Sequence, residues 1–125
     1  TDVTGFGLLG HLSEVCIASK VSAEIEAEKI PFLSSVKKFI LSDIFTGASL
    51  RNWEHYKRRI LLKSSNNNFY KKLLTDPQTS GGLIISVKKQ KSKEIIKILK
   101  KHKFVYADII GKIKKYDEKH LITVI

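Results

Sequence analysis

The chain has 125 residues, a length typical of one domain that can bury a hydrophobic core. Its 42% hydrophobic and 28% charged residues are ordinary for a globular protein, and no apolar run approaches the roughly 18 residues of a membrane helix. We therefore expect a single domain over residues 1–125 with no membrane association. Since no signal peptide is recognisable, we also expect a cytoplasmic location.

The net charge of +11 is spread unevenly. Residues 88–125 hold 12 of the 23 basic residues and 4 of the 12 acidic ones, a net charge of +8. Such a segment can bind nucleic acid through its phosphates. Its lysines are scattered around a predicted helix and along predicted strands with few aromatic residues between them, which is more typical of a solvated face. We favour the solvated face and keep nucleic-acid binding as an alternative.

The first twelve residues place short polar side chains and glycines ahead of an apolar run. Helical spacing in that run predicts a helix from about Gly5 to Ser19. Asp2 and Thr4 either cap this helix, the commonest role of such residues, or belong to a ligand site. A helix N-terminus with nearby glycines suits a phosphate, and Asp2 could supply an oxygen ligand to Mg²⁺. Spacing alone favours the cap.

The next segments give one strand, one helix and a weakly patterned region. Residues 21–28 alternate apolar and polar side chains, which predicts a strand with one wet face. Pro31 begins a second predicted helix that ends near Ser42. Over residues 43–68 the pattern weakens: we expect a turn at residues 46–49 and, from Ser64 onward, a flexible or local insertion.

Trp53 lies in this weakly patterned region, near the basic group Lys57, Arg58 and Arg59. An aromatic side chain beside basic residues is compatible with base stacking in a charged groove. The alternative is a half-buried tryptophan that pins a long loop, and we favour it.

A second polar loop covers residues 75–82, Thr75-Asp76-Pro77-Gln78-Thr79-Ser80-Gly81-Gly82. It is rich in turn formers and opens onto residues 83–87, an apolar run that predicts a core strand. The usual explanation is a tight turn before the strand. Short polar side chains beside two glycines are also what a loop facing a phosphate or another domain would use.

The last third predicts a helix and two strands. The helix begins near Ser92 and ends near His102, with a buried side formed by Ile95, Ile96, Ile98 and Leu99. Strands are expected over residues 105–113 and 121–125, joined by a charged turn. The order of elements predicts an α/β (α+β) fold, a layered mixed sheet with flanking helices.

Cysteine and histidine give no sign of a metal or catalytic centre. The single cysteine, Cys16, falls on the apolar face of the first predicted helix, so we expect a buried structural thiol rather than a nucleophile. The four histidines lack the spacing of a zinc site and are expected to be surface or capping residues: His11, His55, His102 and His120.

Two long motifs, residues 1–11 and residues 76–83, occur in the order found in one enzyme family. The chain therefore resembles the C-terminal domain of selenophosphate synthetase, also called selenide, water dikinase. Gly47 with Arg51-Asn52 and residues 107–111 agree more weakly. The resemblance covers nearly the whole chain and implies a fold similar to the C-terminal domain of aminoimidazole ribonucleotide synthetase.

The resemblance also implies a reaction and a site. In that family ATP, selenide and water become selenophosphate, AMP and orthophosphate, with ATP and Mg²⁺ in the cleft between this domain and an N-terminal domain that pairs into a homodimer. It implies that Asp2 is a Mg²⁺ ligand, which replaces the capping role as our preferred interpretation. Thr4, Gly5 and Gly7 would lie near the phosphates. A further set of residues would face the cleft: Asp76, Gln78, Thr79, Ser80, Gly81 and Gly82.

Several parts of the family pattern are absent from these 125 residues. The glycine-rich N-terminal segment, the catalytic Cys or selenocysteine with its lysine, and the other metal-binding aspartates do not occur, and Cys16 does not match. We therefore expect no catalytic residue here, a missing N-terminal catalytic domain, and no activity from the chain alone. The alternatives are a sister ATP-dependent enzyme, such as a thiamine monophosphate kinase or hydrogenase maturation relative, and a non-catalytic basic module that binds RNA or protein.

Overall fold

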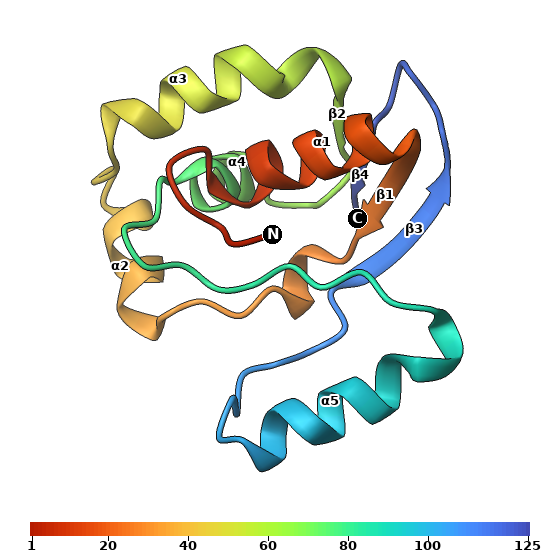
Figure 1. Ribbon diagram of the computed structural model, residues 1–125. Helices are drawn as coiled ribbons and strands as arrows, with labels where there is room; N and C mark the ends of the chain where they lie inside the picture. The colour runs from red at the N-terminus through yellow and green to blue at the C-terminus, as the bar shows by residue number, and fades with distance from the viewer.

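A mixed four-stranded sheet organises the chain (Figure 1). The structure is a computed structural model that describes all residues from 1 to 125. β1 runs parallel to β4, which runs parallel to β2, whereas β3 pairs antiparallel with β1. The spatial order is β2-β4-β1-β3, so β2 and β3 are the edge strands. The strands are β1 (Val21–Ile25), β2 (Ile60–Leu62), β3 (Gly111–Lys115) and β4 (Ile122–Val124).

Five α-helices accompany the sheet: α1 (Gly7–Ser19), α2 (Ser34–Leu41), α3 (Gly47–Tyr56), α4 (Asn67–Thr75) and α5 (Ser92–Lys101). Short 3₁₀ turns add η1 (Ala27–Lys29), η2 (Lys57–Arg59) and η3 (Lys89–Lys91). None of the helices has the length and apolar character needed to cross a membrane. The predicted layered mixed sheet with flanking helices is confirmed.

The two faces of the sheet differ in polarity. Alternate side chains point to opposite faces of a strand, so Ala23 and Ile25 face the core together with Ile122 of β4. The other face carries Glu24, whose carboxylate lies 2.7 Å from the Lys112 ammonium of β3. The strand predicted over residues 21–28 is confirmed for residues 21–25 only, since Ala27–Lys29 form η1, and Ser22 of the predicted wet face is buried.

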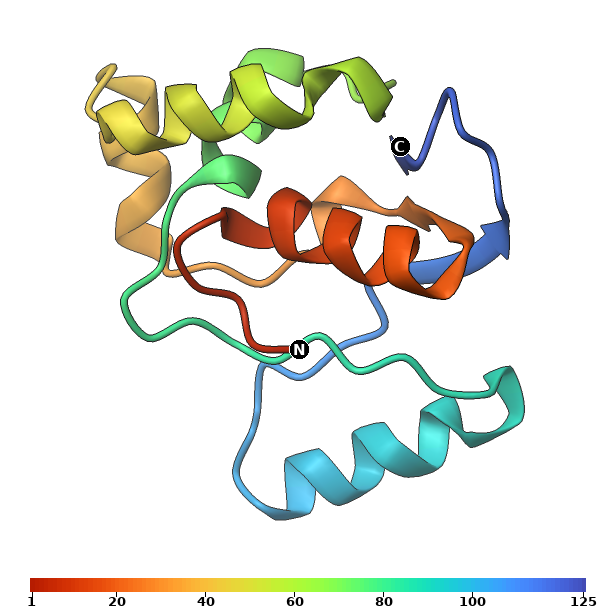
Figure 2. The ribbon, with the colours of Figure 1, turned by 45° about the horizontal axis from the view of Figure 1, so that its top comes forward.

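Helix α1 packs on β1 and β4 and against α3 and α4, as Figures 1 and 2 both show. Its apolar side buries Leu9, Leu12 and Cys16 almost completely. Burial raises the pKa of the Cys16 thiol, which makes it a poor nucleophile at neutral pH. The predicted helix and the predicted structural role of Cys16 are both confirmed.

Two predictions about buried elements are wrong. Residues 83–87 are extended, but their only sheet-like pairing is an isolated bridge between Leu83 and Asp2, and Leu83 is 68% exposed. Helix α5 forms where predicted, yet none of its residues is buried and Ile98 is exposed. In both views α5 lies apart from the other helices (Figures 1 and 2). The sequence identified both elements as apolar, but the chain covers them only in part: Ile84, Ile95, Ile96 and Leu99 are half-buried.

The weakly patterned middle region is more regular than predicted. Residues 46–49 do not form a free turn, because Thr46 caps α3 by accepting a hydrogen bond from the Ser49 backbone N–H at 3.1 Å. Trp53 is half-buried as predicted, but on a helix rather than in a loop. β2 was not predicted. The asparagine-rich stretch leads into a helix, since Asn66 caps α4.

Two further segments differ from expectation. The predicted strand over residues 105–113 begins only at Gly111, and residues 104–110 form turns and irregular chain. Helix α2 is confirmed over Ser34–Leu41, but Ile40 is its one buried residue and Phe39 is exposed. The final strand is confirmed as β4.

Candidate functional site

The two polar loops meet, although about 75 residues separate them in the chain. The backbone N–H of Val3 donates to the Gly82 carbonyl at 2.9 Å, and the Gln78 N–H donates to the Thr4 carbonyl at 3.0 Å. Beside them, Asp2 and Leu83 form the isolated antiparallel bridge. Residues 1–7 and 75–82 are therefore one connected surface, which we call the loop junction.

Two glycines allow the backbones of the loop junction to approach closely. A Cβ on Gly81 would overlap the carbonyl oxygen of Val3 and lie 3.0 Å from Gln78 Cβ. Gly7 has φ +67°, and a Cβ there would lie 2.7 Å from the Thr75 carbonyl carbon. Protein backbone thus fills the space beside Gly7 and Gly81. The space beside two other predicted site residues is open: Gly5 and Gly82.

Asn52 of α3 ties the two loops together through its side-chain amide. Its Nδ2 donates to the Gly5 carbonyl and to the Thr75 carbonyl, both at 2.9 Å. One residue from the middle of the chain thereby satisfies a carbonyl of each loop. The sequence indicated Asn52 only as part of a weak family agreement, and a polar side chain within a helix is the signal that could have identified it.

A pair of buried hydroxyl groups lies next to the loop junction, at the C-terminal end of α4. Ser49 Oγ lies 2.9 Å from Thr75 Oγ1, and both side chains are buried. Ser49 Oγ also donates to the Lys72 carbonyl at 3.1 Å. These buried hydrogen bonds hold the C-terminal end of α4 against α3. They thereby fix the position at which the second loop begins.

Asp76 is held inside the second loop. Thr46 Oγ1 donates to one carboxylate oxygen at 3.3 Å, and Gln78 Nε2 donates to the other at 3.1 Å. Burial raises the pKa of the Asp76 carboxyl, and these two hydrogen bonds oppose that effect only in part. Of the remaining predicted loop residues, Thr79 and Ser80 are exposed.

The first loop contradicts the capping interpretation. Phe6 occupies the N-cap position of α1, and no side chain caps this helix. Asp2 is exposed, with its backbone bridged to Leu83. The hydroxyl of Thr4 lies 3.0 Å from His11 Nε2. His11 itself is only 12% exposed, so the prediction of a surface or capping histidine is wrong.

The donors of the loop junction fit a hard cation only in part. Mg²⁺ binds oxygen ligands and usually takes one or two protein carboxylates, with water and phosphate oxygens completing its shell. The exposed carboxylate of Asp2 is such a ligand. The chain contains no cluster of three or more acidic, histidine or cysteine side chains that would hold a metal by itself. Any cation here would therefore take most of its ligands from outside the chain.

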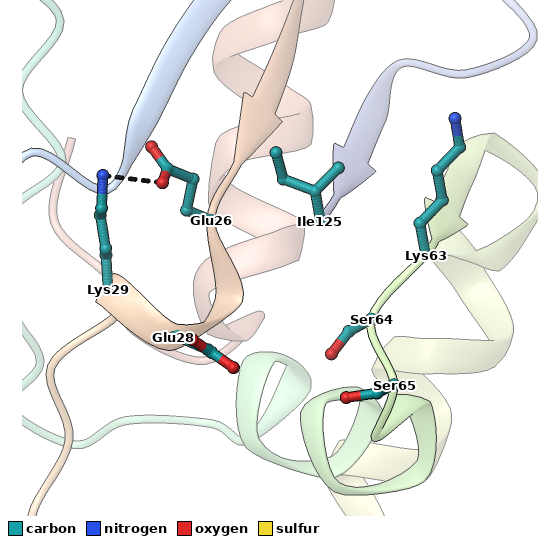
Figure 3. A pocket seen from close by; sticks show the side chains of 7 residues that line it. All are labelled: Glu26, Glu28, Lys29, Lys63, Ser64, Ser65 and Ile125. Carbon is teal, nitrogen blue, oxygen red and sulfur yellow. Dashed lines mark ion pairs between the residues drawn. The ribbon is translucent and has the colours of Figure 1, made fainter.

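A separate hollow of about 350 Å³ lies where β1, β2 and β4 end (Figure 3). It sits beside the start of α4, whereas the loop junction is at the opposite end of that helix. Lys29 in its wall is paired with Glu26 at 2.7 Å. None of the predicted site residues lines it. The lining residues are Glu26, Glu28, Lys29, Lys63, Ser64, Ser65 and Ile125.

Comparison with known proteins identifies similar sequences over almost the whole chain. The model of a family described as AIR synthase related protein, C-terminal domain, matches residues 1–123. The chain is 39% identical over 111 residues to a selenide, water dikinase of Dechloromonas aromatica, covering 89% of this chain and 32% of that protein.

Two other relatives carry the same name. The one of Pseudomonas straminea is 43% identical over 91% of this chain and 32% of its own length. The one of Aliarcobacter butzleri is 38% identical over 98% of this chain and 35% of its own length. The chain thus spans about a third of the length of the curated relatives that it matches.

Proposed function

Because the chain belongs to the family of AIR-synthase-related C-terminal domains, we propose that it is the C-terminal domain of a selenide, water dikinase. The complete enzyme converts ATP, selenide and water into selenophosphate, AMP and orthophosphate. The observation that carries the proposal is the loop junction, since the two motifs that resemble this enzyme family are hydrogen-bonded into one surface.

Asp2 is the proposed metal-binding residue. Its carboxylate is exposed beside the junction, and Thr4, Gly5 and Gly7 follow it on the same loop. A Mg²⁺ ion bound there would offset the negative charge of the triphosphate. The glycine that leaves open space is Gly5, so the backbone around it is the part of the first loop that a phosphate can approach most closely.

The rest of the enzyme is the proposed partner of the exposed apolar surface. Leu83, Ile85 and Val87 are exposed directly after the second loop, and the apolar side of α5 is only partly covered, with Ile98 exposed. Apolar surface of this extent commonly marks an interaction site. An N-terminal domain docked there would close an ATP cleft over the loop junction, and the complete enzyme is a homodimer in this proposal.

The chain alone is expected to be inactive, because it offers one candidate metal carboxylate and no accessible nucleophilic cysteine. The lysines of residues 88–125 are assigned to a solvated surface rather than to nucleic-acid binding. Part of that charge is already neutralised within the chain, since Lys91 pairs with Glu94 and Lys112 pairs with Glu24.

Phosphorus NMR of the full-length parent tests the proposal. With Mg·ATP under anaerobic conditions, AMP, orthophosphate and a selenium-bonded phosphate should form only when selenide is added. Formation of ADP would indicate a sister kinase, and no turnover at all would contradict the enzymatic proposal.

Asp2→Asn in the parent tests the metal role. We expect the variant to fold normally and to require far more Mg²⁺, since an amide is a much poorer ligand for a hard cation than a carboxylate. Asp108→Asn is the matched control, because Asp108 is an exposed aspartate in the chain before β3. An unchanged Mg²⁺ requirement in Asp2→Asn would remove the metal assignment.

A further inference from the structure

The backbones that meet at the loop junction form the first hydrogen-bonded pairs of an antiparallel ladder. The Val3 N–H donates to the Gly82 carbonyl at 2.9 Å, and the Ile84 N–H donates to the Thr1 carbonyl at 2.8 Å. The Thr1 nitrogen donates in return to the Ile84 carbonyl at 3.1 Å. These bonds set a register in which each step back from Val3 matches one step forward from Gly82.

Beyond Ile84 the second partner of this ladder continues without a neighbour. Residues 83–87, which we call the apolar segment, run as extended chain toward η3 (Figures 1 and 2). The backbone N–H and carbonyl groups of residues 85–87 have no hydrogen-bond partner in the chain. Alternate residues of a strand direct these groups to the same side. The N–H and carbonyl of Ser86 therefore point to the side on which Thr1 pairs with Ile84.

The side chains of the paired residues show the alternation of a ribbon with one inner and one outer face. Val3 is buried and Ile84 is half-buried against the core, whereas Asp2 and Leu83 are exposed. Ile85, the first residue after the last pair, is exposed as the pattern requires. The apolar segment thus keeps the geometry of a strand at the point where its partner ends.

Resting on the proposed function, in which an N-terminal domain precedes this chain, we infer that residues 85–87 are the docking site for the segment that leads into Thr1. That segment continues the antiparallel pairing as an added strand. The residue immediately before Thr1 then lies opposite Ile85 in a pair without hydrogen bonds. The second residue before Thr1 forms a hydrogen-bonded pair with Ser86 and exchanges two backbone bonds with it.

The position of Thr1 favours this segment over an extended chain from another molecule. Because the Thr1 nitrogen is already bonded to the Ile84 carbonyl, the preceding residue begins beside the unpaired groups. In both views the N-terminus lies against the apolar segment (Figures 1 and 2). A connected segment also avoids the loss of translational and rotational freedom that a separate molecule would incur on binding.

The added strand has two consequences for the complete enzyme. It removes an open backbone edge beside the exposed side chains of Leu83, Ile85 and Val87, a combination that otherwise invites aggregation. It also joins the two domains by a paired ribbon instead of a flexible linker, which restricts how the N-terminal domain sits over the loop junction.

Engineered cysteines in the full-length parent test the register. Opposite residues in a pair without hydrogen bonds have Cα atoms about 4.5 Å apart, within the range of a disulfide. A cysteine placed immediately before Thr1 should therefore form a disulfide with Ile85→Cys when the protein is treated with glutathione disulfide. Val87→Cys with the same partner is the matched control, because a diagonal neighbour is about 7–8 Å away. Peptide mass spectrometry identifies the bond.

We expect the Ile85→Cys pair to become mostly cross-linked and the Val87→Cys pair to stay mostly reduced. Equal cross-linking of both pairs would show a flexible linker, and no bond to Ile85→Cys would show that the segment leaves in another direction. Either result would overturn the inference. A parent that makes no selenium-bonded phosphate but forms the Ile85→Cys bond would instead refute the proposed function alone.

Amide hydrogen exchange at Ser86 in the unmodified parent gives a measurement that needs no variant. Its N–H should be protected, and exchange as fast as in an unstructured peptide would contradict the added strand. A proline as the second residue before Thr1 removes the donor to the Ser86 carbonyl and should speed this exchange about 2- to 12-fold, the effect of one hydrogen bond. A proline immediately before Thr1 is the matched control, because the N–H there points away from the apolar segment. Equal effects of the two prolines would also contradict the register.

Discussion

The close approach of the two loops makes Gly81 the most sensitive position of the junction. In Gly81→Ala the new methyl group would overlap the Val3 carbonyl oxygen, which is backbone and cannot rotate away as a side chain could. Restoring van der Waals contact requires the loops to separate by more than about 1 Å. The adjacent Gly82 has nothing within 4 Å of its Cβ position, so Gly82→Ala is a matched control.

The cost follows from the hydrogen bonds that a separation would break. The bond from Val3 N–H to the Gly82 carbonyl and the bond from Gln78 N–H to the Thr4 carbonyl are the backbone links across the gap. Each contributes about 0.5–1.5 kcal/mol net, so Gly81→Ala should lower the free energy of unfolding by about 1–3 kcal/mol. For a chain of this length that corresponds to roughly 4–12 °C in Tm.

Urea unfolding and amide hydrogen exchange would measure the effect. Gly81→Ala should unfold at lower urea and lose protection at the amides of Val3 and Gln78, while Gly82→Ala should stay within about 0.5 kcal/mol of wild type. If Gly81→Ala were as stable as Gly82→Ala, with both amides still protected, the two loops would not be packed as described.

Three further perturbations test other contacts by the same urea assay. Asn52→Ala removes two hydrogen bonds and should lower the free energy of unfolding by about 1–3 kcal/mol. Asn68→Ala is the control and should leave it unchanged, because Asn68 is exposed. Equal stability of the two variants would exclude the bridging role of Asn52. Because burial raises the pKa of Asp76 in the folded state, its contribution to stability is greatest at low pH and declines as pH rises through that pKa. The difference in unfolding free energy between wild type and Asp76→Asn should accordingly fall as pH rises above the ordinary pKa of an aspartate, 3.8, and a rising difference would reverse the assigned direction. Asp43→Asn leaves the largely buried ammonium of Lys72 without its carboxylate and should lower the free energy of unfolding by about 1 kcal/mol. An unchanged free energy of unfolding would show that solvent already screens the pair.

Local sequence signals predicted the parts of the fold whose pattern is repeated over several turns. α1 has an apolar stripe and was found with nearly correct ends, whereas the alternation that predicted β1 continues to residue 28, three residues beyond the end of the strand. α3 was missed because its first residues are those of a turn: Thr46 and Gly47 begin turns and cap helices equally well. What decides between the two is the packing of α3 on α4, which no local pattern records.

The structure brings together the two loops that the sequence singled out, and their role in binding stays a prediction. Both loops were identified from their unusual composition, and the structure joins them. The residues that join them were not found, because Asn52 acts on carbonyls 47 and 23 residues away and His11 acts on Thr4 from the next element. Contacts between residues so far apart in the chain produce no periodic pattern in the sequence. The exposed residues 83–87 show the converse limit, since an apolar run predicts a strand but does not supply a partner.

Part of the positive charge of residues 88–125 lies on the edge strand β3, where it has a consequence that involves no ligand. An open edge offers unpaired backbone groups to any other extended chain and so invites aggregation. Along β3, Lys112, Lys114 and Lys115 occupy three of five positions. A second molecule that added its own β3 to this edge would bring lysines of the two copies close together, and like charges across paired strands repel. The lysines of this strand therefore disfavour the pairing of two such edges.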